Sequence, residues 1–579
     1  MGADRNGYCM SHVIRFVRAL AASLLFAALG IHAQTFNDVL GIVPPIAPGA
    51  YPVGCSNVEQ DFSRLMGGDA QAYWEGRGGG GTGYVTDLLV DPAHAFVVNV
   101  SMPDDRDLYG DFRNRTLAYA NLVCYPTTDT NPYANYALPN GKVVPHMQRG
   151  GQPPIFAVAR ERFPVLLFSH GFGGSPISSD YIEALKLFAS HGYVVVAPFH
   201  GDSRYVDARI STLDDLLRAI LDFQNYTAMQ AARPQSLSRA LDVVLADPSF
   251  AARIDPTRIG GFGASAGGES MLLMRGAKLT VSVGTALKSV IDDTRLKAAV
   301  GYVPYFGQPF FPAFGRDSQG LEGIDLPYLA ISGGADTTAP AEVTAQGMTL
   351  LTGPKQFVVL DGVRHGFDVA SSDDIFTWSL TFLGAYVDDD PLARATSARM
   401  AKVAGGGDDV LLLDRWQPLP PGTGEALSVE YYNASLDHYF MTADANEVSI
   451  LDAGIAIPGW QRTGYTYKVY PPESTLGTAA CRLLGKPGVG PNTHFFTILA
   501  NECQDVKNNP LWIFEGLVFR TEGPDAIGAC AANRIPVIRM YNNGKGGQAN
   551  HRYLTSHSEV GVMLGQGWMV EGLVFCTPP

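Results

Sequence analysis

The chain has 579 residues, of which 46% are hydrophobic and 17% charged, a composition typical of a globular protein rather than a disordered or fibrous one. This length is too great for one hydrophobic core, so two or three domains are expected. The net charge of −14 argues against nucleic acid or an anionic membrane surface as a partner.

The first 33 residues have the pattern of a secretion signal peptide. Basic residues precede an apolar run at 19–31, and Ala33 is the expected residue before the cleavage site. The run is too short to span a bilayer, and no second apolar stretch of about 20 residues follows it. We therefore expect a secreted or periplasmic protein without a membrane span.

Cysteine usage agrees with export. Cys9 lies in the predicted signal peptide, and the other six cysteines are Cys55, Cys124, Cys481, Cys503, Cys530 and Cys576. An even number favours disulfides in an oxidising compartment. We expect a Cys55–Cys124 disulfide and two more among the last four cysteines, whose connectivity is open. No Cys-x-x-Cys spacing occurs, so a zinc site is not expected.

Residues 34–160 are rich in Gly, Pro, Asn and Tyr, with strand-like runs at 95–100 and 116–124. We interpret them as the leading antiparallel strands of the first domain. The glycine run at 78–81 is interpreted as a flexible loop, because no Lys-Ser/Thr pair and helix follow it as in a phosphate-binding loop.

From residue 163 onward, strand and helix patterns alternate. The expected strands are 164–168, 193–198, 258–262, 298–303, 328–332 and 356–360, and the expected helices are 180–190, 213–229, 237–245 and 269–273. This alternation predicts an α/β domain over 34–390, with a mostly parallel sheet and helices on both faces. Turn-rich residues at 391–425 predict a linker.

A repeated pattern fills residues 426–579. Its three copies are Asp-His-Tyr-Phe at 437–440, Thr-His-Phe-Phe at 493–496 and Asn-His-Arg-Tyr at 550–553, each followed by a Glu and then by Trp-x-x-x-Gly. Each unit is too small to bury its own apolar face, so three should close into an all-β domain with pseudo-threefold symmetry. The repeated His438, His494 and His551 either satisfy buried backbone groups or line three ligand pockets in which Trp and Tyr stack on sugar rings.

The motif Gly-Ala-Ser-Ala-Gly at 263–267 follows a predicted strand and precedes a predicted helix. In this setting Gly-x-Ser-x-Gly indicates a nucleophile elbow, where Gly263 and Gly267 avoid collisions and Ser265 is pushed into the open. The helix that follows points its free N–H groups at the group that the serine attacks.

A serine nucleophile needs a histidine base, and the histidine needs a carboxylate. In a sheet of this kind the acid and then the histidine follow the serine along the chain, each after a strand. Asp336 and His365 follow the last two predicted strands of the domain, so Ser265, Asp336 and His365 are the predicted catalytic triad. Asp361 is the competing acid, but it lies only four residues before the histidine.

An oxyanion hole supplies two N–H donors where the carbonyl oxygen becomes negative. We expect one donor from Ala266, directly after the nucleophile, and the other from Phe172 in the glycine-rich turn at 169–174. The alternative for this segment is a plain glycine-rich turn. His170 and His200 also lie near strand ends and are interpreted as structural.

Aromatic residues cluster at 302–314. We expect Tyr305 and Phe306 in this cluster to line an acyl pocket for the substrate, with core packing as the equal alternative. No metal and no organic cofactor are expected for the chemistry of a serine nucleophile.

Four motifs carry a family resemblance: His-Gly-Phe-Gly-Gly at 170–174, Gly-Ala-Ser-Ala-Gly at 263–267, Gly-Gly-Ala-Asp-Thr-Thr-Ala-Pro at 333–340 and Arg-His-Gly-Phe at 364–367. In this order they resemble the α/β-hydrolase superfamily, closest to the branch of dienelactone hydrolases, platelet-activating-factor acetylhydrolase-like enzymes and polyester-cleaving cutinases. The resemblance covers residues 50–390 and implies the fold and the triad, not the substrate. Dienelactone hydrolases use a cysteine where this chain has Ser265, which favours ordinary ester hydrolysis.

The C-terminal repeats resemble an uncharacterised repeat domain of secreted bacterial proteins. Together, these observations predict a secreted serine esterase or lipase that cleaves carboxylic esters through an acyl-enzyme. The appended repeats favour a polymeric or aggregated ester, with a carbohydrate or surface ligand for the repeats. The alternatives are a peptidase or acyltransferase of the same fold, and an adhesion or carbohydrate-binding protein with an inert hydrolase domain.

Overall fold

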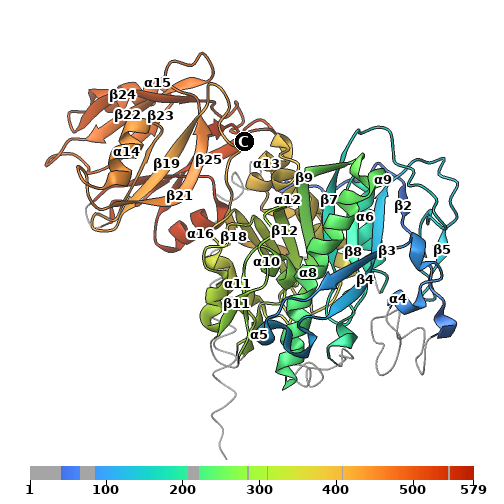
Figure 1. Cartoon of the computed structure of the whole chain (residues 1–579). Helices are drawn as coiled ribbons and strands as arrows, with labels where there is room; N and C mark the ends of the chain where they lie inside the picture. The colour runs from blue at the N-terminus through green and yellow to red at the C-terminus, as the bar shows by residue number, and fades with distance from the viewer. Residues whose placement is uncertain are drawn as a thin grey trace, which may run out of the picture.

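The computed structural model describes residues 41–64, 85–178, 180–206, 221–282, 286–309, 311–406, 408–545 and 548–579. The predicted signal peptide at 1–33, the glycine run at 78–81 and the first part of the helix expected at 213–229 lie outside these residues. Figure 1 shows a larger part built on a wide sheet and a smaller part formed by the C-terminal region.

Ten strands form the main sheet, in the order β18-β16-β15-β12-β9-β7-β8-β4-β2, with β3 also paired to β4. Their bounds are β2 Val53–Cys55, β3 Phe96–Ser101, β4 Thr116–Pro126, β7 Phe163–Ser169, β8 Val194–Pro198, β9 Ile254–Ala264, β12 Leu296–Tyr302, β15 Tyr328–Gly333, β16 Lys355–Leu360 and β18 Asp409–Arg415. The six strands from β8 to β16 run parallel to one another. β2, β3 and β4 are antiparallel at one edge, and β18 is antiparallel at the other. The predicted mostly parallel sheet with leading antiparallel strands is confirmed.

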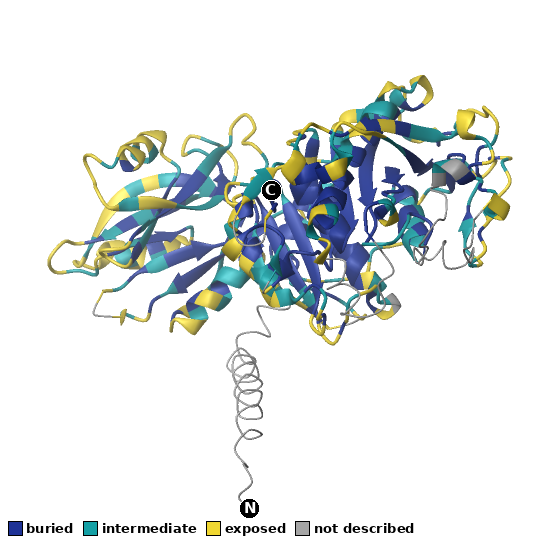
Figure 2. Cartoon of the chain, turned by 60° about the horizontal axis from the view of Figure 1, so that its bottom comes forward, coloured by how far each residue is buried: buried dark blue, intermediate teal, exposed yellow. Residues whose placement is uncertain are grey.

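Helices cover both faces of this sheet. They are α6 Tyr181–Ser190, α8 Phe223–Ala246, α10 Ala266–Met274, α11 Ala341–Leu350 and α12 Ser372–Tyr386. One apolar core lies between the sheet and α8, α10 and α11, and a second lies between the sheet and α6 and α12. Every residue of β7 is buried, which explains its almost continuous apolar sequence. Figure 2 shows the buried strands between partly exposed helices.

Shorter elements complete this part of the chain. They are β1 Ile42–Val43, α4 Val85–Leu88, α5 Arg106–Tyr109, β5 Tyr136–Ala137, β6 Val143–Val144, α9 Pro248–Ala251, β10 Lys278–Thr280, β11 Leu287–Ser289, β13 Gly307–Gln308, β14 Phe311–Pro312, α13 Pro391–Arg399 and β17 Lys402–Val403, with 3-10 turns at 62–64, 92–94, 110–112, 202–204, 316–321 and 369–371.

Several expected boundaries differ from the structure; the strand expected at 258–262, for example, is β9 Ile254–Ala264. The helices expected at 213–229 and 237–245 are joined in the single helix α8, which contains Pro234. Proline removes one helical hydrogen bond, yet α8 continues through this position, where the neighbouring residues are largely buried. The stretch at 391–425 is more regular than a linker, because it contains α13 and the sheet-edge strand β18.

The C-terminal region contains three similar units, each with a three-stranded antiparallel sheet whose first strand lies in the centre. Their elements are β19 Ala426–Asn433, β20 His438–Thr442, α14 Ala445–Ala453 and β21 Trp460–Val469; β22 Thr478–Gly485, β23 His494–Thr497, α15 Ala500–Asn508 and β24 Trp512–Thr521; and β25 Ile535–Tyr541, β26 His551–Leu554, α16 His557–Gly565 and β27 Met569–Thr577. The last strands of all three units contact one another, so the units form a closed ring.

The expected antiparallel β units are present, but the domain is not all-β, because each unit has a helix between its second and third strands. The repeated Glu447, Glu502 and Glu559 each lie in the first turn of that helix. A carboxylate is favoured there by the helix dipole. The side chains of Asp444 and Ser556 also cap the N-termini of α14 and α16. Such capping residues indicate the start of a helix and were visible in the sequence of the repeats.

Arginines join the three units across their boundaries. The pairs are Arg482–Glu447 (2.7 Å), Arg539–Glu502 (3.0 Å) and Arg552–Glu430 (2.9 Å). In the first two pairs, a helix glutamate binds an arginine on the central strand of the next unit. In the third pair the charges are reversed: the glutamate lies on the central strand β19 of one unit, and the arginine lies on β26 of another. The same type of contact therefore closes all three boundaries with different residues.

The repeated histidines are not equivalent in space. Contacts between units include the rings of His494 and Phe440 (4.5 Å), the rings of His551 and Phe495 (5.2 Å), and the Arg552 guanidinium over the Tyr439 ring (4.0 Å). Tyr439 therefore takes the place of the histidine in the first unit, and His438 lies one position earlier, level with Thr493 and Asn550. The side chains of these two residues accept backbone N–H groups of His551 and Tyr439 at 3.3 and 3.0 Å. The expected satisfaction of buried backbone groups is thus performed by Thr493 and Asn550.

Three disulfides are present, as expected. Cys55–Cys124 joins β2 to β4, Cys481–Cys503 joins β22 to α15, and Cys530–Cys576 joins the loop before β25 to β27. Their presence is compatible with an extracellular or periplasmic protein.

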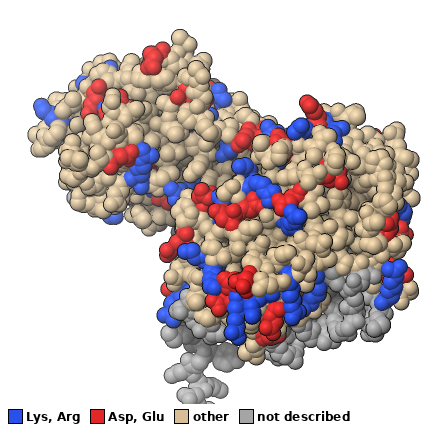
Figure 3. All heavy atoms as spheres, in the orientation of Figure 1, with Lys and Arg blue, Asp and Glu red and all other residues tan. Residues whose placement is uncertain are grey.

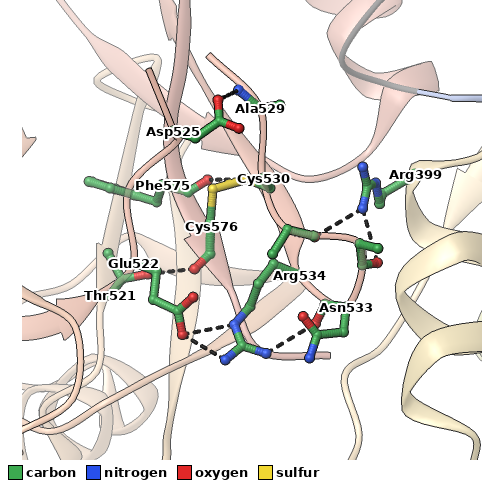
Figure 4. Close-up of a disulfide and its surroundings, with 12 residues drawn as sticks. Arg399, Thr521, Glu522, Asp525, Ala529, Cys530, Asn533, Arg534, Phe575 and Cys576 are labelled. Atoms are coloured by element: carbon green, nitrogen blue, oxygen red, sulfur yellow. Dashed lines mark hydrogen bonds and ion pairs between the residues drawn. A yellow bond between two sulfur atoms is a disulfide. The ribbon is translucent and has the colours of Figure 1, made fainter. Parts of the chain in front are cut away.

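The two parts of the chain meet through α13 and β18. Asp414 of β18 accepts hydrogen bonds from the backbone N–H groups of His557 and Ser558 at the start of α16, at 3.1 and 2.7 Å. Arg399 of α13 donates to the carbonyl oxygens of Ala531 and Ala532, in the loop that the Cys530–Cys576 disulfide ties to β27 (Figure 4). The junction therefore combines a buried carboxylate on β18 with exposed hydrogen bonds from α13.

Acidic and basic side chains lie next to one another on the face shown in Figure 3. That face therefore has mixed charge rather than a uniformly basic surface. Among the helices of the described ranges, none is both long and apolar enough to cross a lipid bilayer.

Replacing Arg552 tests the inter-unit contacts. Its side chain is 2% exposed and binds both Glu430 and Glu559. Arg552→Met leaves two carboxylates without their cation, so we expect a loss of about 3–5 kcal/mol in unfolding free energy. Denaturant unfolding of the full chain, followed by tryptophan fluorescence, measures this. Arg462→Met, at an exposed pair with Asp452, is the matched control, and an equal effect of both variants would contradict the prediction.

Candidate active site

Ser265 lies at the sharp turn between β9 and α10. Its φ and ψ are 54° and −119°, a strained backbone for a residue with a side chain. A Cβ added at Gly263 would lie 2.1 Å from the Gly267 carbonyl oxygen, and one at Gly267 would lie 2.0 Å from the Ser169 carbonyl oxygen. Only glycine fits at both positions, so the two glycines allow the strand, turn and helix to approach this closely.

The structure brings the three predicted triad residues together. His365, in the loop after β16, has Nε2 3.0 Å from Ser265 Oγ. Asp336, in the loop after β15, has Oδ2 2.7 Å from His365 Nδ1. Because β9, β15 and β16 are parallel, the loops after them open at the same edge of the sheet. The competing Asp361 is exposed instead.

Hydrogen bonds fix the orientation of this set. The second carboxylate oxygen of Asp336 accepts the N–H groups of Thr338 and Ala339 at 2.8 and 2.9 Å, and the carboxylate is completely buried. With Nδ1–H donated to Asp336, Nε2 of His365 is free to accept the proton of Ser265 Oγ. This geometry can convert a serine hydroxyl into a nucleophile.

The turn at 170–174 lies against the serine. A Cβ added at Gly171 would be 3.6 Å from Ser265 Cβ, and the Gly171 N–H donates to the hydroxyl of Tyr181 at 3.1 Å. Among the described residues, the N–H of Phe172 has no hydrogen-bond acceptor. Ala266 is the first residue of α10, where the helix itself cannot satisfy the N–H. Within the part of the chain that the structure describes, both predicted oxyanion donors are therefore backbone N–H groups without a backbone acceptor.

His170 and His200 are buried behind this turn. His200 lies between Ser169 Oγ (2.8 Å) and Ser236 Oγ (3.0 Å). His170 donates Nδ1–H to the Gly171 carbonyl at 2.8 Å and accepts the His200 N–H at Nε2. Burial, with the nearby Arg233, lowers the pKa of His170 to about 4 and holds that of His200 well below its usual range. Both are neutral, with contacts of the kind expected for structural residues.

The aromatic cluster lies on the other side of the elbow. Tyr305 is buried, and its N–H donates to the Ser265 carbonyl at 3.1 Å. Phe306 packs in the core against Phe314 and Tyr328, with centroid distances of 5.4 and 6.4 Å. The structure thus places Tyr305 beside the nucleophile and Phe306 in the core, and their part in substrate binding stays a prediction.

Sequence analysis missed a buried acid at the site. Glu269 lies one turn after Ser265 in α10, is completely buried, and accepts a hydrogen bond from Gln230 Nε2 at 2.5 Å. Burial raises its pKa to about 8, so the carboxyl is largely protonated at neutral pH. Its four-residue spacing from Ser265 was visible in the sequence, but its burial under α8 was not.

Arg233 and Asp202 were also missed. They form an ion pair behind the turn at 170–174, with both side chains 1% exposed. In the part of the chain that the structure describes, no group of three or more His, Cys, Asp or Glu side chains is arranged to hold a metal ion.

Comparison with known protein families finds one match. Residues 428–578, which contain the three C-terminal units, match a family described as a domain of unknown function (DUF5648). A search of curated proteins finds no match to the chain.

The raised pKa of Glu269 makes stability depend on pH. Between about pH 5 and 8 the native chain keeps this proton and the unfolded chain loses it, so the native state is destabilised as pH rises. Glu269→Gln cannot lose a proton. Its unfolding free energy relative to wild type should therefore rise by up to about 1.4 kcal/mol per pH unit in this range. Denaturant unfolding at several pH values measures the difference, and a difference that does not change with pH would contradict the assignment.

Proposed function

We propose that this protein is a secreted serine hydrolase of the α/β-hydrolase type that cleaves carboxylic esters. The observation that carries the proposal is the continuous hydrogen-bond chain from Ser265 Oγ through His365 to the buried Asp336, with distances of 3.0 and 2.7 Å. The mostly parallel sheet and the chain order serine, acid, histidine support it, because both are typical of this fold.

In the proposed mechanism, His365 Nε2 takes the proton of Ser265 Oγ as the oxygen bonds to the ester carbonyl carbon. The carbonyl oxygen becomes negative and accepts the N–H groups of Phe172 and Ala266. Asp336 stabilises the imidazolium of His365 through Nδ1. When the carbonyl re-forms, the alcohol oxygen leaves and takes the proton from His365.

The acyl group is then bonded to Ser265 Oγ. A water molecule gives a proton to His365 and attacks the acyl carbon, and the same two N–H groups hold the second oxyanion. Collapse of this intermediate releases the acid and returns the proton to Ser265. Apart from the ester and water, these steps need no further reactant, since proton transfers and a serine nucleophile account for the whole reaction.

The substrate class is part of the proposal. An appended domain raises the local concentration of an enzyme at a surface that it binds, which favours a polymeric or aggregated ester. The three disulfides support a role outside the cytoplasm.

Hydrolysis of p-nitrophenyl esters with short to long acyl chains tests the activity. We expect wild type to cleave them and Ser265→Ala to lose about 10⁴-fold or more in kcat, because the nucleophile is gone. Ser397→Ala, which changes a buried serine that bonds Gln356 away from the site, is the control. A folded wild-type chain that cleaves none of these esters would contradict the proposal, and acyl transfer to added alcohol would identify a transferase.

A matched pair of asparagine variants tests the acid. Asp336→Asn should lower kcat by about 10⁴-fold, because the amide stabilises the wrong histidine tautomer. Asp361→Asn changes an exposed carboxylate on the histidine loop and should leave kcat unchanged. The reverse result would transfer the role to Asp361.

A further inference from the structure

A buried ion pair lies behind the turn at 170–174. Arg233 of α8 donates from Nε to Asp202 Oδ1 at 3.0 Å and from Nη2 to Oδ2, and both side chains are 1% exposed. Burying two charges is costly even when they are paired, and an apolar pair of similar volume is often as stable. Stability alone therefore gives no reason for charges at this place.

The remaining hydrogen bonds of the pair go to the backbone of the turn. Arg233 Nη1 donates to the carbonyl oxygen of His170 at 2.7 Å, and Nη2 donates to that of Gly171 at 3.1 Å. Asp202 Oδ2 accepts the N–H of Gly173 at 2.8 Å. The planar guanidinium, with its fixed fork of donors, thus binds the carboxylate on one side and two successive carbonyls on the other.

These contacts bracket the free N–H of Phe172. The two carbonyl groups before it accept from the arginine, and the second, that of Gly171, also accepts from His170 Nδ1 at 2.8 Å and from the Gly174 N–H at 3.1 Å. The N–H after it is held by the aspartate. The peptide between Gly171 and Phe172 has its carbonyl oxygen directed at Arg233. Because the carbonyl and N–H of a trans peptide point in opposite directions, the Phe172 N–H is directed away from the pair.

We propose that Arg233 and Asp202 are positioning residues that hold the Phe172 N–H where the oxyanion forms. This inference rests on the proposed ester hydrolysis. Neither side chain touches the reacting atoms, and both act through the backbone of the turn. Preorganised donors of this kind contribute to catalysis without reorganisation during the reaction.

Arg233→Lys tests the proposal. Lysine keeps the charge beside Asp202 but lacks the planar fork, so it cannot bind the carboxylate and both carbonyls together. We expect kcat for p-nitrophenyl butyrate to fall about 10²-fold with little change in KM, since loss of one oxyanion donor costs about 10²–10³ in kcat.

A thionoester substrate separates positioning from general damage. Sulfur is a weak hydrogen-bond acceptor, so the thiono analogue of the same ester gains less from the oxyanion donors. We expect the ester-to-thionoester ratio of kcat to fall at least about tenfold in Arg233→Lys. A structural defect that lowers the active fraction reduces both rates equally and leaves the ratio unchanged.

Two further variants complete the experiment. Arg253→Lys is the matched control, because Arg253 donates to the carbonyls of Ala157 and Arg160 near the opposite end of β7. It should keep the wild-type ratio. The double variant Arg233→Gln with Asp202→Asn removes both charges together, so no buried charge is left unpaired. It therefore avoids unfolding caused by an unpaired charge. It should show the same fall in the ratio.

The outcomes are distinguishable. A folded Arg233→Lys with wild-type kcat or an unchanged ratio overturns the positioning role and leaves the proposed hydrolase intact. Failure of both the single and the double variant to fold identifies a structural pair and also overturns it. If wild type cleaves no ester, or Ser265→Ala is as active as wild type, the proposed function falls and this inference falls with it.

Discussion

The close approach of three backbone segments at Gly263 and Gly267 is the constraint on which the candidate site depends. A side chain at either position would collide with the Gly267 or Ser169 carbonyl at about 2 Å. Because no side chain intervenes, the end of β7, the elbow and the start of α10 pack directly on one another. The strained Ser265, the free N–H groups of α10 and the turn after β7 therefore meet in a small volume. The loops that carry Asp336 and His365 only need to reach this point from neighbouring strands.

The parts of the site that the sequence predicted have local signatures combined with topology. Ser265 is recognisable from the glycines on either side of it, and Asp336 and His365 follow apolar strands whose parallel order brings their ends to one edge of the sheet. Arg233, Asp202 and Glu269 have no such signature. Arg233 and Glu269 are ordinary charged residues in helical segments, and their burial arises only when α8 and α10 pack on the sheet. A tertiary contact of this kind has no period or motif from which it can be read.

The three C-terminal units do repeat in the structure, but the histidines that recur in the sequence are not all structurally equivalent. Histidine recurs in all three units, and so do the glutamate and the tryptophan. The contacts between units nevertheless show that Tyr439 occupies the position that His494 and His551 occupy in the other two units, so His438 lies one residue out of register with them. At the third boundary a guanidinium takes the place of one ring: Arg552 lies over Tyr439 and is also paired with Glu430 of the first unit. Conservation of an interaction between units is therefore stricter here than conservation of residue type.

The junction between the two parts limits how the C-terminal units can act. Asp414 belongs to the edge strand of the main sheet, yet its buried carboxylate caps the N-terminus of α16 in the third unit. Trp416 and two alanines of α13 share an apolar core with all three units. A domain attached in this way is not a freely moving tether, and its surfaces have a fixed orientation relative to the triad. If the units bind the same polymer or aggregate that the triad cleaves, only the faces on the side of the strand ends can engage it during a reaction.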